Sequence, residues 1–255
     1  MGVRFGSIAS GSAGNALLVE VGGTRVMVDC GLGLAIARER IAQRGWEPES
    51  IDAILVTHEH GDHISGVGKF ARKHGTKVIA SYGTLSFLGD IINVEQCVEI
   101  DGHHAFAIND VWVEPYCVPH DAREPLQYVL GDGSVRLGIL TDVGRSTPHI
   151  ESTLSNCDAL VLECNHDEEM LLGGPYQYAL KQRVIGPFGH LSNSTAAALL
   201  GRLERKRLKH LIAAHLSQQN NTEDLARSSL AEVMGCTSDW IGVATQNEGF
   251  NWRDI

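Results

Sequence analysis

The histidine-rich loop after the apolar run IDAILVT constrains this chain more than any other feature of its sequence. The run is typical of a buried strand. It ends directly before four side chains that can bind metal, His58, His60, Asp62 and His63. Imidazole is the commonest metal ligand in proteins, and a carboxylate adds compensating negative charge. The alternative is a solvated loop that is rich in histidine by chance. It is weak because 12 histidines among 255 residues would rarely place three around an aspartate.

The rest of the sequence predicts a layered α/β protein with mixed sheets. Short β-branched runs are bounded by Gly, Pro, Asp or Asn, and helical patterns intervene mainly in the later part of the chain. We expect strands at 16–21, 24–29, 53–57, 77–81, 111–118, 127–130, 136–141, 159–163, 210–214 and 240–245. We expect helices at 34–43, 66–74, 146–155, 194–206 and 223–233. No linker or repeat divides the chain, so a single domain over residues 1–255 is expected.

The charge balance bears on the class of substrate. Acidic residues outnumber basic ones by 31 to 21, a formal net charge of −10. Such a chain repels a polyanion such as DNA unless cations are added or basic residues gather on one face. The segment 202–210 holds five of the 21 basic residues. We interpret it as the solvated end of a helix, where cations suit the helix dipole, in preference to a nucleic-acid stripe.

The cysteines and the N-terminal segment indicate a cytoplasmic protein. The six cysteines form no C-x-x-C pair, and several lie in apolar runs, as reduced buried thiols do. The first residues lack the pattern of a signal peptide, and no apolar run approaches the roughly 18 residues needed to cross a bilayer. We therefore expect no membrane association.

The histidine-rich loop matches the T-H-x-H-x-D-H signature of the metallo-β-lactamase fold superfamily. Four further segments resemble motifs of this superfamily in order along the chain: VDCG at 28–31, VPHD at 118–121, LTDVG at 140–144 and AAHLS at 213–217. The resemblance implies a four-layer αββα sandwich with two mixed β-sheets. It also implies metal-assisted hydrolysis.

The resemblance carries a complete ligand set for two divalent metal ions, either zinc or manganese, with iron as a further candidate. It places His58, His60 and His120 on the first metal and Asp62, His63 and His215 on the second. Asp142 bridges the two ions, and a carboxylate suits this role because it has two oxygens. The resemblance assigns Asp29 to orienting the ligand loop from behind.

Further segments resemble the YycJ (WalJ) branch of the superfamily and cover nearly the whole chain. They lie at 7–15, 162–167, 174–176, 180–183, 189–193, 215–217 and 220–222. The branch implies a 5′-to-3′ DNA exonuclease that uses a metal-bridging hydroxide, with ribonuclease Z and cyclic phosphodiesterases as relatives. Cys164 departs from the serine expected there, but it is not among the expected metal ligands.

Two residues are expected to move protons. Asp62 can accept one from the attacking water, and His190, just before a Ser-Asn-Ser helix start, can protonate the leaving oxygen. A capping or structural role is the alternative for His190. The candidate substrate contacts are Ser12, Asn15, His166, Lys181 and Arg183. For His166 a buried polar role is an equal alternative, and a surface helix would also carry Lys181 and Arg183 for solubility.

Other functions remain open from the sequence alone. The same metal pair could hydrolyse RNA, a cyclic phosphodiester, a thioester or a lactone. Thioesterases of this fold usually add a C-terminal helical domain, and only 40 residues follow His215 here. A non-enzymatic metal-binding scaffold would not need a complete ligand set. The oligomeric state stays open.

Overall fold

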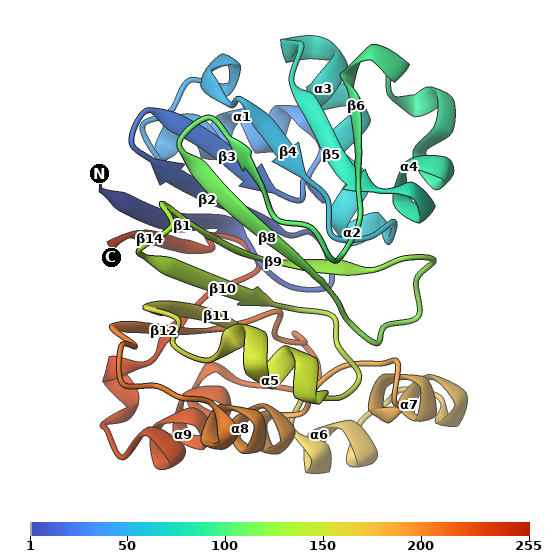
Figure 1. Cartoon of the computed structure of the whole chain (residues 1–255). Helices are drawn as coiled ribbons and strands as arrows, with labels where there is room; N and C mark the ends of the chain where they lie inside the picture. The colour runs from blue at the N-terminus through green and yellow to red at the C-terminus, as the bar shows by residue number, and fades with distance from the viewer. Residues whose placement is uncertain (1) are drawn as a thin grey trace.

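Two mixed sheets packed face to face form the centre of the fold (Figure 1). The computed structural model describes residues 2–255. The first sheet has seven strands in the order β14-β1-β2-β3-β4-β5-β6. Their bounds are β1 Val3–Ala9, β2 Ala16–Val21, β3 Thr24–Val28, β4 Ala53–Leu55, β5 Lys77–Ser81, β6 Cys97–Ile100 and β14 Phe250–Asp254.

The second sheet also has seven strands, in the order β13-β12-β11-β10-β9-β8-β7. Their bounds are β7 Phe106–Ile108, β8 Val111–Cys117, β9 Leu126–Gly131, β10 Arg136–Leu140, β11 Ala159–Glu163, β12 His210–Ala214 and β13 Gly242–Val243. In both sheets antiparallel pairs lead into a parallel run, β3-β4-β5-β6 in the first and β10-β11-β12-β13 in the second. The carboxyl ends of parallel neighbours lie at one edge of a sheet, so the loops that follow them converge.

Helices cover both outer faces (Figure 1). Beside the first sheet lie α1 Leu34–Gln43, α2 Gly61–Ile64, α3 Val67–His74 and α4 Tyr82–Leu88. Beside the second lie α5 Pro148–Leu154, α6 Glu168–Gly173, α7 Tyr178–Ile185, α8 Asn193–Arg202 and α9 Glu223–Met234. Short 3₁₀ turns occur at Pro48–Ser50, Gly89–Ile91, Val94–Gln96 and Ser238–Trp240. The predicted αββα sandwich with two mixed sheets is confirmed. No helix within residues 2–255 is long and apolar enough to cross a membrane.

The two sheets share one buried apolar core. Val26 and Leu55 from the first sheet pack in the same cluster as Leu137 and Val161 from the second. Tyr128 on β9 adds a polar tie, because its hydroxyl donates a hydrogen bond of 2.7 Å to the carbonyl oxygen of Val56, just after β4. This bond joins the two sheets immediately before the histidine-rich loop, so it restrains the backbone at the start of that loop.

The predicted helix 34–43 and the strands 16–21, 77–81, 159–163 and 210–214 have the bounds expected from the sequence. The remaining predicted elements differ mainly at their ends. The predicted helix 194–206 begins at Asn193, because the Ser192 hydroxyl caps it by accepting from the Thr195 amide, and it already ends at Arg202. The strand predicted at 240–245 is reduced to Gly242–Val243, because a 3₁₀ turn occupies Ser238–Trp240.

Several elements were not predicted. They are the strands β1, β6, β7 and β14 and the helices α2, α4, α6 and α7. β6 and β14 lie at the two edges of the first sheet and β7 at an edge of the second, and they are only partly covered, so their sequences lack a clear alternation of apolar and polar residues. The four helices span four to eight residues, too few for a helical period to stand out.

Candidate metal centre

The clustered histidines and aspartates lie in loops that follow strands of both sheets. The loop after β4 carries His58 and His60, and helix α2 presents Asp62 and His63. His120, Asp142 and His215 follow β8, β10 and β12 of the second sheet. The two sheets therefore supply the two sides of the site, which is why residues distant in sequence meet.

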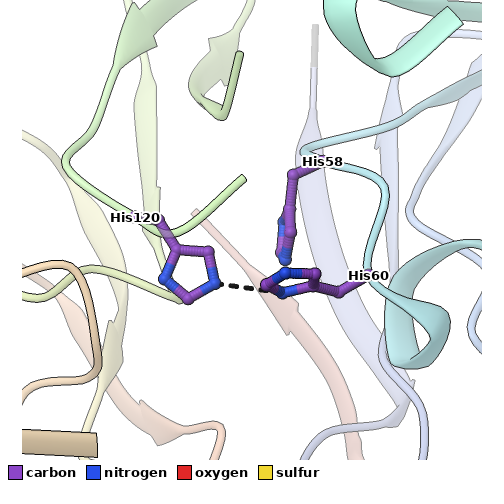
Figure 2. A group of neighbouring side chains, drawn as sticks. All are labelled: His58, His60 and His120. Atoms are coloured by element: carbon purple, nitrogen blue, oxygen red, sulfur yellow. Dashed lines mark hydrogen bonds between the residues drawn. The ribbon is translucent and has the colours of Figure 1, made fainter. Parts of the chain in front are cut away.

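Three histidines form the first cluster (Figure 2). One ring nitrogen from each of His58, His60 and His120 lies within 4.8 Å of the others. His120 Nε2 is 3.2 Å from His60 Nδ1, and the rings stand nearly perpendicular to that of His58. Figure 2 shows the three rings converging from the loop after β4 and the loop after β8. This arrangement presents three nitrogen donors to one point, as a transition-metal site requires.

A second cluster combines Asp62, His63, Asp142 and His215, whose donor atoms also lie within 4.8 Å of one another. His63 Nε2 is 3.1 Å from Asp142 Oδ2, and His215 Nε2 is 3.4 Å from Asp62 Oδ2. Asp142 Oδ1 lies 3.9 Å from His120 Nε2 of the first cluster. Asp142 therefore stands between the two clusters, at the position predicted for a bridging ligand.

A buried atom indicates that a cation completes the site. Within residues 2–255, His58 Nε2 has no hydrogen-bond partner. A buried polar atom without a partner costs free energy, and cores rarely tolerate one. Nitrogen and carboxylate oxygen donors suit zinc, manganese or iron, so the residues present fit divalent metal ions.

Asp29 lies directly behind the histidine loop. Its carboxylate accepts hydrogen bonds of 2.8 Å from the Thr57 amide, the Thr57 hydroxyl and His63 Nδ1. The bond to Nδ1 fixes the His63 ring so that Nε2 faces the cluster. An aspartate in this position orients a metal-binding imidazole and raises its basicity.

Three residues at the centre adopt a left-handed backbone conformation. The φ angles are 61° at Asp29, 53° at Asp142 and 55° at His215. Residues other than glycine rarely occupy this region, and such strain gathers at functional sites. Each of the three residues follows a buried strand, so the unusual turn redirects its side chain from the strand end into the site.

Glu163, at the end of β11, is the important residue that our sequence analysis did not assign. It is fully buried and accepts hydrogen bonds from His190 Nδ1 at 2.9 Å and His215 Nδ1 at 3.1 Å. It also accepts from the backbone amides of residues 142, 143 and 191. The sequence did offer one indication of its role: Glu163 is an acidic residue at the end of an otherwise apolar strand. Carboxylates are rarely buried unless they are paired, so partners for Glu163 could have been expected.

The carboxylates control protonation at the centre. Burial and the neighbouring His63 charge hold the pKa of His58 well below its usual value, so its ring is neutral and can bind metal. Burial opposes a charged His215, but the surrounding carboxylates Asp142, Asp62 and Glu163 raise its pKa to about 10. Burial likewise opposes a charged His63, and Asp142 and Asp29 raise its pKa well above the ordinary range. The metal-free second cluster therefore holds protons that a cation would displace.

The clusters open into a cleft of about 370 Å³. Three predicted functional residues outside the ligand set line it, namely Ser12, Arg183 and His190. Arg183 is paired with Asp121 at 2.6 Å at the rim. A larger hollow of about 570 Å³ shares Ser217 with the cleft but contains none of the clustered side chains.

The other three predicted substrate contacts, Asn15, His166 and Lys181, do not line this cleft. Asn15 is buried, and its amide contacts Gly11, Asp62 and His63, so it supports the ligand loop from within. The Lys181 ammonium donates to the carbonyl oxygens of Leu172 and Gly174, so two of its three N–H donors have internal partners. His166 is buried and lines a separate cavity, which His190 also lines.

The basic segment 202–210 is not a free nucleic-acid stripe. Arg202 pairs with Glu151 at 2.7 Å, and Arg207 pairs with Asp158 at 2.9 Å. Arg205 donates to the carbonyl oxygen of Val233. These bonds join neighbouring elements of the fold and agree with our preference for a structural interpretation.

Comparison with known proteins tests the assignment of the fold and the family. The family model described as "Beta-lactamase superfamily domain" matches residues 24–215, a range that contains every proposed metal ligand. The chain belongs to this superfamily. As a superfamily member it has the predicted class of a metal-dependent hydrolase, and its two clusters agree with divalent-metal binding.

Two relatives match this superfamily member over most of its length. It is 35% identical to "Exodeoxyribonuclease YycJ" of Bacillus anthracis over 240 residues, which cover 92% of this chain and 90% of the relative. It is 33% identical to "Exodeoxyribonuclease WalJ" of Streptococcus pneumoniae over 250 residues, 95% of this chain and 92% of the relative. The resemblance to the YycJ (WalJ) branch is confirmed.

A solved structure supports the superfamily fold independently. The metallo-β-lactamase fold protein YhfI of Bacillus subtilis superposes with a TM-score of 0.77 and covers 100% of this chain and 99% of that one. Their sequences are 16% identical, so this likeness concerns the fold alone.

The protonated state of the second cluster gives a testable prediction. Below about pH 10 His215 carries a proton in the metal-free protein, and binding a cation must displace it. Metal affinity should therefore rise with pH, by about tenfold per pH unit for each displaced proton. Calorimetric titration of the metal-free protein with Zn²⁺ at pH 6 to 8, in buffers of different ionisation enthalpy, measures both effects. An affinity that does not change with pH, with no proton release, would contradict this interpretation.

Proposed function

We propose that the protein is a dinuclear metal-dependent phosphodiesterase that acts on nucleic acid as a DNA exonuclease. The observation that carries the proposal is the meeting of two metal-binding clusters at Asp142, in a cleft that also contains His190. His58, His60 and His120 would hold one cation, and Asp62, His63 and His215 the other, with Asp142 between them. Such a pair, when bound, polarises a phosphodiester and activates a water for attack.

Asp62 and His190 divide the proton transfers in this proposal. Asp62 lines the cleft, and contacts with His215 and His63 hold the pKa of its carboxyl well below its usual range despite burial, so it is ionised and can accept a proton. Burial opposes a charged His190, but Glu163 raises its pKa. With Nδ1 held by Glu163, the other ring nitrogen of His190 remains free to protonate the leaving oxygen.

DNA is proposed as the substrate because both full-length relatives bear the name exodeoxyribonuclease. The formal charge of −10 means that attraction for a polyanion must be local to the metal centre and weak elsewhere. Two divalent cations would add four positive charges at the cleft. The 5′-to-3′ direction rests on the branch resemblance.

The core shared by the two sheets supports one domain over residues 1–255, which we propose acts in the cytoplasm.

A cleavage assay that determines from which end DNA is degraded tests the proposed function directly. Purified protein loaded with Zn²⁺ or Mn²⁺ should release nucleotides from the 5′ end of labelled single-stranded DNA and lose this activity with chelator. The same assay on RNA, a cyclic nucleotide, a thioester and a lactone decides among the alternative substrates. If DNA and bis-p-nitrophenyl phosphate both resist hydrolysis by the loaded protein, the proposal is wrong.

His190→Ala tests proton transfer separately from metal binding. Because His190 contacts Glu163 and is not among the proposed ligands, the variant should retain its bound metal. We expect turnover to fall by about 10²–10⁴-fold, the usual contribution of a general acid. Metal content by elemental analysis and cleavage rate are measured together, with the highly exposed His104→Ala as the matched control. Full activity of His190→Ala would assign this histidine to a structural role.

A further inference from the structure

A further hollow, of about 200 Å³, shares His190 with the metal cleft. Leu172 and Ile185, which are 59% and 43% exposed, supply apolar surface on its open side, and His166, Glu168 and Thr195 supply polar groups. Apolar walls with a few placed polar groups are typical of a ligand pocket. The volume is below the roughly 300–1,000 Å³ of pockets for drug-sized ligands, so it suits a single ring system.

His166 presents a hydrogen-bond acceptor to this cavity. Its side chain is only 1% exposed, and Nδ1 lies 3.3 Å from Asn165 Oδ1. The Asn165 amide nitrogen donates to the His215 carbonyl oxygen at 3.1 Å, so its oxygen is the acceptor, and His166 Nδ1 carries the proton. With Nδ1 protonated, the neutral ring presents Nε2 as a hydrogen-bond acceptor. Burial lowers the pKa of His166, which keeps the ring neutral.

Glu168, an exposed residue that lines the same hollow, presents a second acceptor. Its Oε1 accepts from the hydroxyls of Ser192 at 2.9 Å and Ser194 at 2.6 Å, which fix the carboxylate at the cavity. These two bonds lower its pKa, so it is ionised. Oε2 makes no hydrogen bond to any of residues 2–255. A ligand group in this cavity therefore meets two acceptors, one from each residue.

The negative charge of Glu168 determines which chemical groups can bind in the cavity. Glu168 carries a negative charge at the cavity, and no lysine or arginine lines it. A phosphate would be repelled, whereas a neutral ring with N–H donors would pair with Glu168 and His166 and stack against Leu172 and Ile185. Nucleobases have this chemistry, and a carboxylate accepts well from their exocyclic amino groups.

We infer that this cavity binds the base of a nucleotide next to the scissile phosphate and favours bases with an exocyclic amino group over thymine. The inference rests on the proposed function. A nucleotide joins its base to its phosphate through one sugar, and His190 lines both the cavity and the metal cleft, so the two adjoin at this residue. Thymine presents two carbonyl oxygens and one N–H, so it would direct an oxygen at an acceptor. Adenine, cytosine and guanine each offer an amino group.

Mononucleotide binding tests the inference without turnover. Calorimetry with the Mn²⁺-loaded protein should show dCMP binding about tenfold more tightly than TMP, the discrimination expected from one good base contact. Glu168→Gln keeps an oxygen for the two serines but turns an N–H₂ donor toward the base, so the preference should fall below about threefold. Glu169→Gln is the matched control, because it makes the same charge change on the same helix outside the cavity.

Cleavage of oligonucleotides that differ only in the terminal base gives the second readout. Terminal dC, dA and dG should be removed faster than terminal dT by the wild type and by Glu169→Gln. Equal rates on all four bases, or an unchanged preference in Glu168→Gln, would overturn the base pocket while leaving the exonuclease activity established. A dCMP preference in a protein that cleaves no DNA would support the pocket and overturn the proposed function.

Discussion

The concentration of buried carboxylates among histidines is the constraint on which the rest of this structure depends. Asp29, Asp142 and Glu163 are all buried at the meeting edge of the two sheets. Charges removed from water are tolerated only when partners or metals satisfy them. The imidazoles satisfy part of this demand in the metal-free protein, and divalent cations would satisfy it in full. The strained turns at Asp29, Asp142 and His215 are held in place by this network and by the sheets beneath it.

The sequence predicted which histidines and aspartates cluster better than it predicted the surroundings of the site. His58, His60, Asp62 and His63 are adjacent in the chain, and the loop after one buried strand brings them together. Asp29 could also be placed, because the resemblance marks its strand end. Glu163 was missed because its partners, His190 and His215, lie far along the chain: His215 meets it through parallel pairing of β11 and β12, and His190 through the loop before α8. For the same reason Asn15 and Lys181 were interpreted as substrate contacts, although internal hydrogen bonds occupy them.

Glu163 links the chemistry of the two sides of the site. Through His215 it supports the second cluster, and through His190 it holds the proposed general acid. The hollow that shares His190 with the metal cleft is lined by Glu168 and by no lysine or arginine. If our proposals hold, the overall charge of −10 is compatible with a nucleic-acid substrate, because two bound cations would supply positive charge at the centre and hydrogen-bond acceptors would recognise the base.

Stepwise metal reconstitution tests the central claim, that two cations act together at this site, most directly. Metal-free protein is titrated with Mn²⁺ or Zn²⁺, bound metal is counted by native mass spectrometry, and the rate of DNA cleavage is measured at each step. The account predicts that two ions bind per chain and that activity continues to rise until the second ion is bound. Full activity with a single bound ion, or binding that stops at one, would contradict it.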